Sequence, residues 1–272
     1  MSDRVTILHL GEGESRQAWR KALADRPWER GTLIKRDGDR EVWQANMLGS
    51  TVAVKVRPAR PRWARLVPTD LARHPIGERY LRRARITTAT NHCLARIGNT
   101  EVLASEWLDG PTVLSCLAEV GGGLRNGLLV ESARMIGVLA IKGILNRDCK
   151  PSNLILQNHD GPIIAMIDVG GVRRKRWVNQ EQYYIGCARM LDTLVHEPAG
   201  VGAPLDPAEI GAIVVSASAA MREHWSWTES RSNTELMVEH HLRLLIEAHG
   251  DATPEVNPLD TADTSHQTEP RA

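Results

Sequence analysis

A short polar stretch and a later aspartate have the residue types and the spacing that phosphoryl transfer needs. Asp148, Lys150 and Asn153 lie within the stretch Asn146–Asn153, and Asp168 follows at the end of a later apolar run. The transferred group carries dispersed negative charge, so catalysis of this reaction is mainly positioning and electrostatic neutralisation. Magnesium ions that bridge phosphates need hard oxygen ligands, and a carboxylate and an amide carbonyl supply them. These four residues are therefore candidates for one site.

Each of these residues has an expected role. Asp148 is the candidate base, because a carboxylate must accept the proton of the hydroxyl that attacks the phosphate. Lys150, two residues further on, is placed to neutralise the γ-phosphate. Asn153 and Asp168 are the candidate metal ligands. We therefore expect Asp148 and Lys150 to be catalytic, and ATP and Mg²⁺ to be the cofactors.

A second group of candidates lies upstream and would hold the nucleotide. Lys55 ends the β-branched run Val52-Ala-Val-Lys55, which reads as a strand. A lysine on a rigid strand can hold the α- and β-phosphates if a carboxylate orients it, and Glu78 on a following helix is the candidate. We further assign Gly38, at a hairpin tip, and Glu106, near the end of a later strand, to nucleotide binding.

Four of these residues also have a plain structural explanation. Lys55 could be a solvated lysine at the end of an edge strand. Asp148 could cap backbone amides in a turn. Glu78 could be a surface carboxylate paired with Arg82 at i+4, and Asp168 could belong to a simple turn. The order and setting of the whole set, rather than any single member, favour the phosphoryl-transfer interpretation.

The elements that would position these residues follow from hydrophobic periodicity and turn signals. We expect strands over 31–35, 41–47, 51–56, 92–97 and 100–107, and a helix over 75–89 that carries Glu78. Helices are then expected from 112 and over 124–142, with a small hairpin of 154–156 and 163–167, and helical structure up to about 249. Strands with one helix followed by helices with one hairpin predict an α+β protein of two lobes. The expected division is 1–107, 108–250 and a disordered tail over 251–272.

The motif set resembles two related kinase families. The stretch from Asn146 to Leu156 is similar to the catalytic loop of eukaryotic-like Ser/Thr kinases, whose pattern ends D-x-K-P-x-N. The stretch from Ile167 to Arg176 more closely resembles the bacterial lipopolysaccharide core kinases, which phosphorylate Kdo or heptose sugars. The resemblance covers about 31–195 and implies a protein kinase-like bilobal fold, with a strand-rich N-lobe and a reduced helical C-lobe.

The chain also departs from the protein-kinase pattern. Asn146 stands where His is usual, and Val169 replaces the Phe of D-F-G. No G-x-G-x-x-G loop precedes Lys55, and no A-P-E follows Asp168. The missing A-P-E leaves little room for a peptide platform, so the expected acceptor is a hydroxyl of a lipopolysaccharide core sugar. The alternatives are a compact Ser/Thr protein kinase, or a pseudokinase that binds a partner without catalysis.

Two basic stretches bear on the expected partners. The run Arg173–Arg176 suits an anionic glycolipid or sugar acceptor. The stretch Arg57–Arg65, which contains Trp63, is compatible with peripheral membrane contact, although a solvated loop is the alternative explanation. We expect no nucleic-acid partner, and the net charge of the 272-residue chain is only +1.

Cysteine usage and hydropathy indicate a compartment. The 4 cysteines are scattered and form no C-x-x-C pair, which favours a reducing environment. The first fifteen residues lack a basic region followed by an apolar core, so no secretory signal is expected. The longest apolar stretch, near 210–221, is too short to span a bilayer. The expected location is therefore the cytoplasm, with possible attachment at the inner membrane face.

Overall fold

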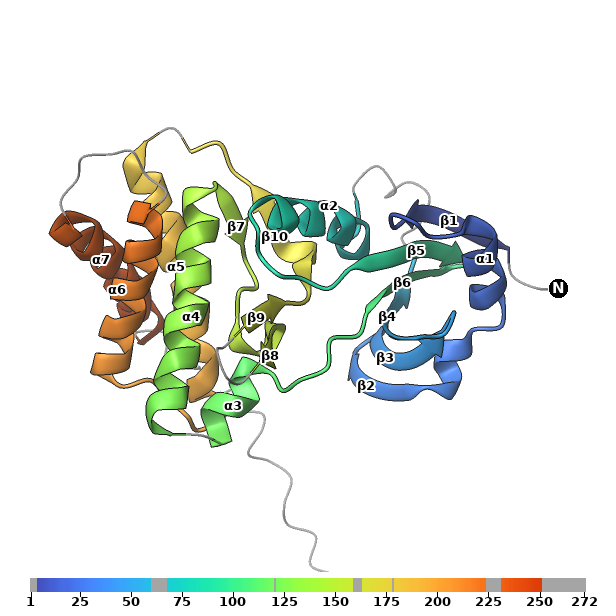
Figure 1. Ribbon diagram of the computed structural model, residues 1–272, viewed down its shortest axis with the longest axis horizontal. Helices are drawn as coiled ribbons and strands as arrows, with labels where there is room; N and C mark the ends of the chain where they lie inside the picture. The colour runs from blue at the N-terminus through green and yellow to red at the C-terminus, as the bar shows by residue number, and fades with distance from the viewer. Residues whose placement is uncertain are drawn as a thin grey trace, which may run out of the picture.

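The computed structural model describes residues 4–59, 68–119, 121–158, 163–177, 179–223 and 231–250. The chain forms an antiparallel sheet in its first part and a mainly helical second part, which lie side by side in Figure 1. This is the α+β arrangement that the sequence predicts, with a strand-rich N-terminal portion followed by a helical C-terminal portion. The expected fold class is confirmed.

Six strands pair in the order β1-β5-β6-β4-β3-β2. Their bounds are β1 (Val5–Leu10), β2 (Thr32–Asp37), β3 (Arg40–Met47), β4 (Ser50–Pro58), β5 (Asn91–Ile97) and β6 (Thr100–Glu106). Each pair of neighbours is antiparallel. β4, which carries Lys55, lies between β3 and β6, and Lys55 is opposite Val42 and Leu103 in the register. Because neighbours on both sides fix β4, Lys55 is held on a rigid strand.

The first thirty residues add structure that the sequence did not predict. β1 pairs with β5, and the short helix α1 (Arg16–Ala24) follows it. Trp19 and Leu23 of α1 are almost fully buried in the core of the N-terminal part. The indole of Trp19 donates a hydrogen bond of 2.7 Å to Glu14. The N-terminal segment is therefore an integral part of the sheet portion.

The helix after β4 begins earlier than expected. α2 spans Asp70–Arg83, whereas Pro75 suggested a start at 75 because proline favours the first helical turn. The structure places Pro75 inside the helix. Thr69 is the N-cap, and its hydroxyl accepts a hydrogen bond of 3.1 Å from the amide of Ala72. The additional turn places His74 one helical turn before Glu78, on the same side of α2.

The second part consists of helices around two small strand pairs. Its helices are α3 (Val113–Glu119), α4 (Gly122–Ile141), α5 (Gln180–Ala199), α6 (Pro207–Glu223) and α7 (Arg231–Gly250). The paired strands are β7 (Ile144–Asn146) with β10 (Val172–Arg174), and β8 (Leu154–Asn158) with β9 (Ile163–Met166). The expected hairpin before Asp168 is thus present as β8 and β9. Helical structure was expected from 112, and α3 begins at Val113 directly after Thr112, whose hydroxyl accepts a hydrogen bond of 3.0 Å from the amide of Ser115.

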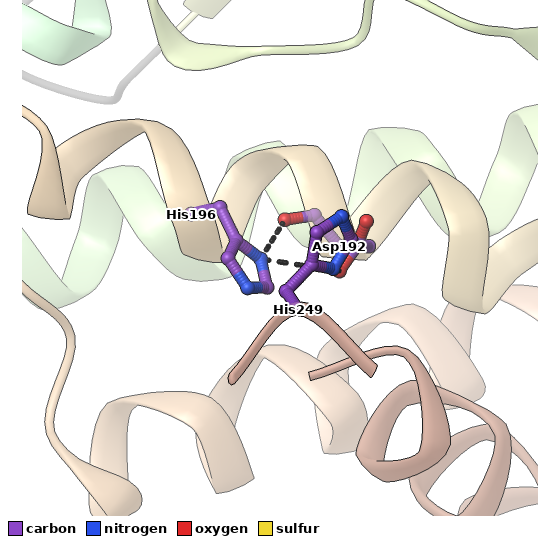
Figure 2. Close-up of side chains that lie close together, drawn as sticks. All are labelled: Asp192, His196 and His249. Atoms are coloured by element: carbon purple, nitrogen blue, oxygen red, sulfur yellow. Dashed lines mark hydrogen bonds and ion pairs between the residues drawn. The ribbon is translucent and has the colours of Figure 1, made fainter. Parts of the chain in front are cut away.

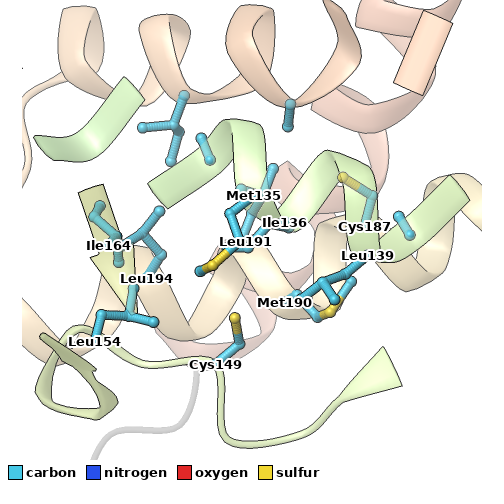
Figure 3. Packing of buried hydrophobic residues seen from close by; sticks show 14 of the residues in the cluster. Met135, Ile136, Leu139, Cys149, Leu154, Ile164, Cys187, Met190, Leu191 and Leu194 are labelled. Carbon is cyan, nitrogen blue, oxygen red and sulfur yellow. The ribbon is translucent and has the colours of Figure 1, made fainter. Parts of the chain in front are cut away.

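The core of the second part positions the polar loop between β7 and β8. α4 and α5 pack their apolar faces together, and the β8–β9 hairpin lies against them (Figure 3). Cys149, which directly follows Asp148, is fully buried in this cluster together with Leu154 and Leu191. Burial of these side chains anchors the loop on both sides of Lys150. Burial also raises the pKa of the Cys149 thiol to about 12, so the thiol is neutral at physiological pH.

Some expectations lie outside the described residues. These are the basic stretch from Arg60 to Arg65 with Trp63, the tip of the β8–β9 hairpin at 159–162, and the tail over 251–272. Arg57, at the described end of the basic stretch, forms an ion pair with Asp70 of α2. Among the described residues, no helix combines the length and apolar character needed to cross a bilayer.

Candidate functional site

A cavity of about 370 Å³ lies between the sheet and the helical part. The sheet contributes Ile34, Val42, Ala53, Lys55 and Glu106, and the helical part contributes Lys150, Asn153 and Asp168. Five of the eight residues assigned to the site from the sequence therefore line one cavity. Trp107 and Leu108, in the connection between β6 and α3, close its back. A cavity of this size falls in the range of small-molecule sites.

Lys55 and Asp168 meet in this cavity. The ammonium Nζ of Lys55 lies 2.8 Å from Oδ1 of Asp168. The side chain of Lys55 is 18% exposed and that of Asp168 is 43% exposed, so the pair is open to the cavity. The contacts that Asp168 makes with Lys55 and His74 are both at Oδ1. Lys55 and Asp168 thus place a cation and an available carboxylate oxygen at the same point.

His74 of α2 is the third member of this cluster. Its Nε2 lies 3.1 Å from Oδ1 of Asp168, and its side chain is 5% exposed. Burial, together with the nearby charge of Lys55, lowers the pKa of His74 to about 4, although the hydrogen bond to Asp168 opposes this shift. The imidazole is therefore neutral at physiological pH and donates its Nε2 proton to the carboxylate.

The same contacts keep Asp168 ionised. Its burial works against ionisation, but the hydrogen bond from His74 and the charge of Lys55 outweigh burial and hold the pKa of Asp168 below its usual range. Asp168 has φ 54° and ψ 57°, the left-handed conformation that aspartate tolerates better than most residues. This conformation turns the chain sharply after β9.

The expectation that Glu78 orients Lys55 is wrong. Glu78 instead forms an ion pair of 2.9 Å with Arg82, the plain i+4 pairing considered as its alternative. Its other oxygen accepts hydrogen bonds from the backbone and side-chain amides of Asn91, at 3.0 and 2.7 Å. Glu78 therefore fastens α2 to β5, and it does not line the cavity of Lys55.

The polar loop holds Asp148 and Lys150 close together. Nζ of Lys150 lies 3.5 Å from Oδ1 of Asp148. The Asn153 side-chain amide donates a hydrogen bond of 3.0 Å to the carbonyl of Asp148, which leaves its Oδ1 as an acceptor. The backbone amide of Asp148 is in turn held by Oδ1 of Asn146 at 3.2 Å. Asn146 can therefore fix this loop although it replaces the usual histidine.

Helix α5 secures the loop from the opposite side. Glu197 accepts hydrogen bonds from the backbone amide of Ser152 at 2.8 Å and from its hydroxyl at 2.5 Å. Ile167, next to Asp168, donates its amide to the carbonyl of Asn153 at 2.9 Å. Because these contacts join the loop to α5 and to the end of β9, the two candidate metal ligands are held in a fixed relation.

Glycines allow α2 and the loop to approach the turn after Asp168. A side chain at Gly77 of α2 would overlap the carbonyl oxygen of Val169. A side chain at Gly171 would come 2.9 Å from Oδ1 of Asn146 and 3.6 Å from Cβ of Asp148. The turn is therefore packed directly between α2 and the loop that carries Asp148.

Of the remaining two nucleotide-binding candidates, Glu106 and Gly38, only Glu106 lines the cavity. Glu106 lines the cavity, but its carboxylate accepts a hydrogen bond of 3.0 Å from the amide of Thr90. Gly38 lies at the tip of the β2–β3 hairpin with φ 58°, and its surroundings are open. Gly38 does not line the cavity, whereas Ile34 and Val42 nearer the base of the hairpin do. The hairpin therefore faces the cavity through side chains and not through its glycine.

The sequence matches no protein-family model and no curated protein. Among solved structures, the chain is similar to a mutant kinase domain of PknI from Mycobacterium tuberculosis, at 16% sequence identity. The likeness covers 77% of this chain and 93% of that one, with a TM-score of 0.41.

Arg173, which the sequence indicated as part of a basic run, is close enough to Arg73 and Arg147 for their charges to act on it. Arg173 follows the turn after Asp168, and its guanidinium donates to the carbonyls of Gly170 and Val172. Burial and the charges of Arg73 and Arg147 lower the pKa of Arg173. Among the described residues, no carboxylate lies within ion-pair distance of these three arginines. These three arginines therefore form a group of positive charges without acidic partners, and one of them, Arg147, directly precedes the candidate base.

His74 and Arg73 are the site residues that sequence reasoning missed. The sequence feature that could have revealed them is Thr69, a strong N-cap residue followed by Asp70. This pair is typical of a helix start. A helix that begins there places His74 and Glu78 on one face, and His74 then becomes the member nearer the turn after Asp168. The contact between Glu197 and Ser152 joins residues far apart in the sequence and leaves no local signal.

Proposed function

We propose that this chain is an ATP-dependent phosphotransferase that transfers the γ-phosphate of ATP to a hydroxyl group. The observation that carries the proposal is the convergence of Lys55, Asn153 and Asp168 on one cavity between the two parts of the molecule. A cation on a central strand and two oxygen donors on loops form the minimum set that positions a polyphosphate. Chance placement of three unrelated surface residues would not bring them together.

The residues present fit a magnesium–nucleotide complex. Oδ2 of Asp168 and Oδ1 of Asn153 are hard oxygen donors, as Mg²⁺ requires, and the contacts of Asp168 with Lys55 and His74 are at its other oxygen. Mg²⁺, when bound, would neutralise charge on the phosphates. Lys55 keeps two further N–H donors beyond its contact with Asp168, and these can bind phosphate oxygens. His74 keeps the Asp168 carboxylate ionised and oriented.

Asp148 is the base in this proposal. Its carboxylate is 43% exposed and does not itself line the cavity, but it lies 3.5 Å from Lys150, which does, and there it could accept the proton of an incoming hydroxyl. Lys150, 3.5 Å away, lines the cavity and can stabilise the charge that develops on the γ-phosphate. The fixed loop holds the two groups in place, so their alignment costs little on substrate binding.

An anionic sugar acceptor, of the lipopolysaccharide core type, is the substrate class we propose. The support is the mutual influence of Arg73, Arg147 and Arg173, none of which has a carboxylate partner among the described residues, and Arg147 directly precedes Asp148. The segment from Val169 to Asn179 contains no Ser, Thr or Tyr, so it cannot itself be phosphorylated to fill that charge. An acidic or phosphorylated acceptor would supply the missing anion. Such a lipid-linked acceptor would place the protein at the cytoplasmic face of the inner membrane.

A compact Ser/Thr protein kinase is the second candidate. Its support is the D-x-K-P-x-N loop, in which Lys150 and Asn153 both line the cavity. A pseudokinase is less favoured, since Lys55, Asp148 and Asp168 are all present and Lys55 and Asp168 meet directly.

The decisive experiment is a phosphate-transfer assay with ATP and Mg²⁺ on the native chain and on Asp148→Asn. Dephosphorylated core glycolipid, intact acidic core glycolipid and a mixed peptide library are offered as acceptors. We expect labelling of glycolipid, with turnover in the variant reduced at least about 100-fold. Labelling of peptides alone would replace the sugar acceptor with a protein acceptor. Equal turnover by the two proteins would remove Asp148 from the mechanism.

A further inference from the structure

A cluster of two histidines and one aspartate lies away from the cavity, where α5 meets the end of α7. Asp192 and His196 stand one turn apart on α5, and His249 reaches them from the last turn of α7 (Figure 2). One potential ligand atom from each of the three lies within 4.8 Å of the others. The ring centroids of the two histidines are 4.4 Å apart.

The carboxylate in this cluster lacks a hydrogen bond. Oδ1 of Asp192 is buried and has no hydrogen-bond partner, although Nδ1 of His196 lies only 3.1 Å away. The reason is that each Nδ1 is aligned with a backbone carbonyl of its own helix: His196 with Asp192 at 3.0 Å, and His249 with Leu245 at 2.9 Å. A buried carboxylate oxygen without a donor is costly, so its placement between two imidazoles calls for a cation.

We propose that Asp192, His196 and His249 bind a zinc-type divalent transition metal ion. Oδ1 of Asp192 lies 3.1 Å from Nδ1 of His196 and 3.5 Å from Nδ1 of His249. Ligands about 2.0–2.1 Å from a tetrahedral zinc ion are separated from each other by about 3.3 Å. The two separations from Asp192 bracket that value, and the potential ligand atoms of the two histidines lie within 4.8 Å of each other.

The chemistry of the ligands favours zinc over magnesium. Imidazole nitrogen and carboxylate oxygen are the ligands that zinc takes, while magnesium prefers an all-oxygen octahedral shell. Binding through Nδ1 requires each neutral imidazole to carry its proton on Nε2 instead. The carbonyls that lose the Nδ1 contact already accept helical amides, so the change leaves no buried acceptor unpaired. His249 is 54% exposed, and its side of the site is therefore open to a water molecule as fourth ligand.

The ion would join two helices that also share apolar contacts. α7 packs on α5, and the cluster lies near the C-terminal end of both helices. The residue after His196 is Glu197, which holds Ser152 in the loop of Asp148. Metal binding would therefore stabilise the helix that supports the proposed catalytic loop.

The test measures metal binding by the full-length, tag-free protein after removal of bound metal, in the absence of nucleotide. Zinc is titrated in the presence of millimolar magnesium, and Co²⁺ replaces zinc for visible spectroscopy. We expect one equivalent of zinc per chain, a melting temperature that rises with zinc concentration, and a cobalt spectrum of tetrahedral type. His249→Ala should weaken zinc binding at least about 10-fold, the least that even an outer-shell partner costs.

Three variants keep the outcome clear. Asp192→Asn preserves the side-chain shape and should also lose zinc binding. His240→Ala removes an exposed histidine elsewhere on α7 and should bind zinc as the native chain does. Asp168→Asn alters the proposed magnesium site and should also leave zinc binding unchanged, so failure of the proposed function would be seen separately. Absence of stoichiometric zinc binding, or equal affinity in His249→Ala and His240→Ala, would overturn the proposal.

Discussion

The ammonium group of Lys55 and the carboxylate of Asp168 form an ion pair of 2.8 Å across the cavity between the two parts of the molecule. Lys55 comes from the central strand β4, and Asp168 follows the hairpin of β8 and β9. The pair therefore joins the sheet to the helical part. It also has a chemical consequence, because it concentrates a cation and a metal-binding oxygen where polyphosphate would lie.

Removing the charge of Lys55 should damage nucleotide use. In Lys55→Met the side chain keeps a similar length but loses its phosphate donors. We expect kcat/KM for ATP to fall by about 100- to 1,000-fold, the typical loss for one preorganised donor. Initial rates measured at varied ATP concentration check this expectation.

Lys35→Met is the matched control for that prediction. Lys35 lines the same cavity from β2, but it is exposed and forms no ion pair with a described residue. Its replacement should change kcat/KM for ATP by less than about threefold, as expected for an exposed charge. If both variants lost activity equally, Lys55 would have no special place in nucleotide binding.

Stability should depend on pH through His74. The pKa of His74 is about 4 in the folded chain, against an ordinary value of 6.5. At a pH between these two pKa values, the unfolded chain binds more protons than the folded chain. The stabilisation from neutral His74 is therefore fully present above about pH 6.5, and it falls as the pH drops toward about 4. The His74 contribution to this loss of unfolding free energy is about 3 kcal/mol, at about 1.4 kcal/mol per unit of pKa difference.

Urea denaturation of the native chain and of His74→Gln, without metal or nucleotide, measures that contribution. Glutamine retains a hydrogen-bond donor but does not titrate, so the variant should show a shallower dependence of stability on pH over this window. Asp168 contributes in a separate range: its lowered pKa adds stability that is lost only below its ordinary value. Identical pH slopes for the two proteins would show that His74 is not buried in its neutral form.

The contact between α2 and the turn after Asp168 should tolerate no side chain at Gly77. A methyl group there would overlap the carbonyl oxygen of Val169 and push α2 away from the site. Overpacking of this kind costs about 1–3 kcal/mol, and we expect Gly77→Ala to lose stability in that range. Gly211→Ala on α6, whose surroundings are open, should instead gain about 0.5–1 kcal/mol because alanine favours helix. Chemical denaturation compares the two, and equal effects would contradict the close approach of α2.

Local patterns were sufficient for the strands from β2 to β6 and for the β8–β9 hairpin, but not for β1, β7 or β10. The β-branched run before Lys55 and the turn at Gly38 predicted β4 and the β2–β3 hairpin, because side-chain alternation and turn chemistry act over a few residues. The loop of Asp148 and the hairpin before Asp168 were also found. These features depend on neighbours in the sequence, and the sequence displays those neighbours directly.

Pairing across the fold could not be predicted in the same way. Lys55 was expected to contact Glu78, but the start of α2 at Asp70 instead of Pro75 brings His74 to Asp168. Glu78 has its own partners in Arg82 and Asn91. A side chain with several possible partners chooses among them by packing of whole elements, which a single sequence does not reveal.

The central claim is that Asp168 helps to bind ATP through Mg²⁺ in the cavity shared with Lys55. Calorimetric titration of ATP, with and without Mg²⁺, on the native chain, Asp168→Asn and Asp148→Asn tests it most directly. We predict that Mg²⁺ lowers the Kd for ATP of the native chain and of Asp148→Asn. In Asp168→Asn, the factor by which Mg²⁺ lowers this Kd should be at least about 10-fold smaller. The same gain from Mg²⁺ in all three proteins would contradict the claim.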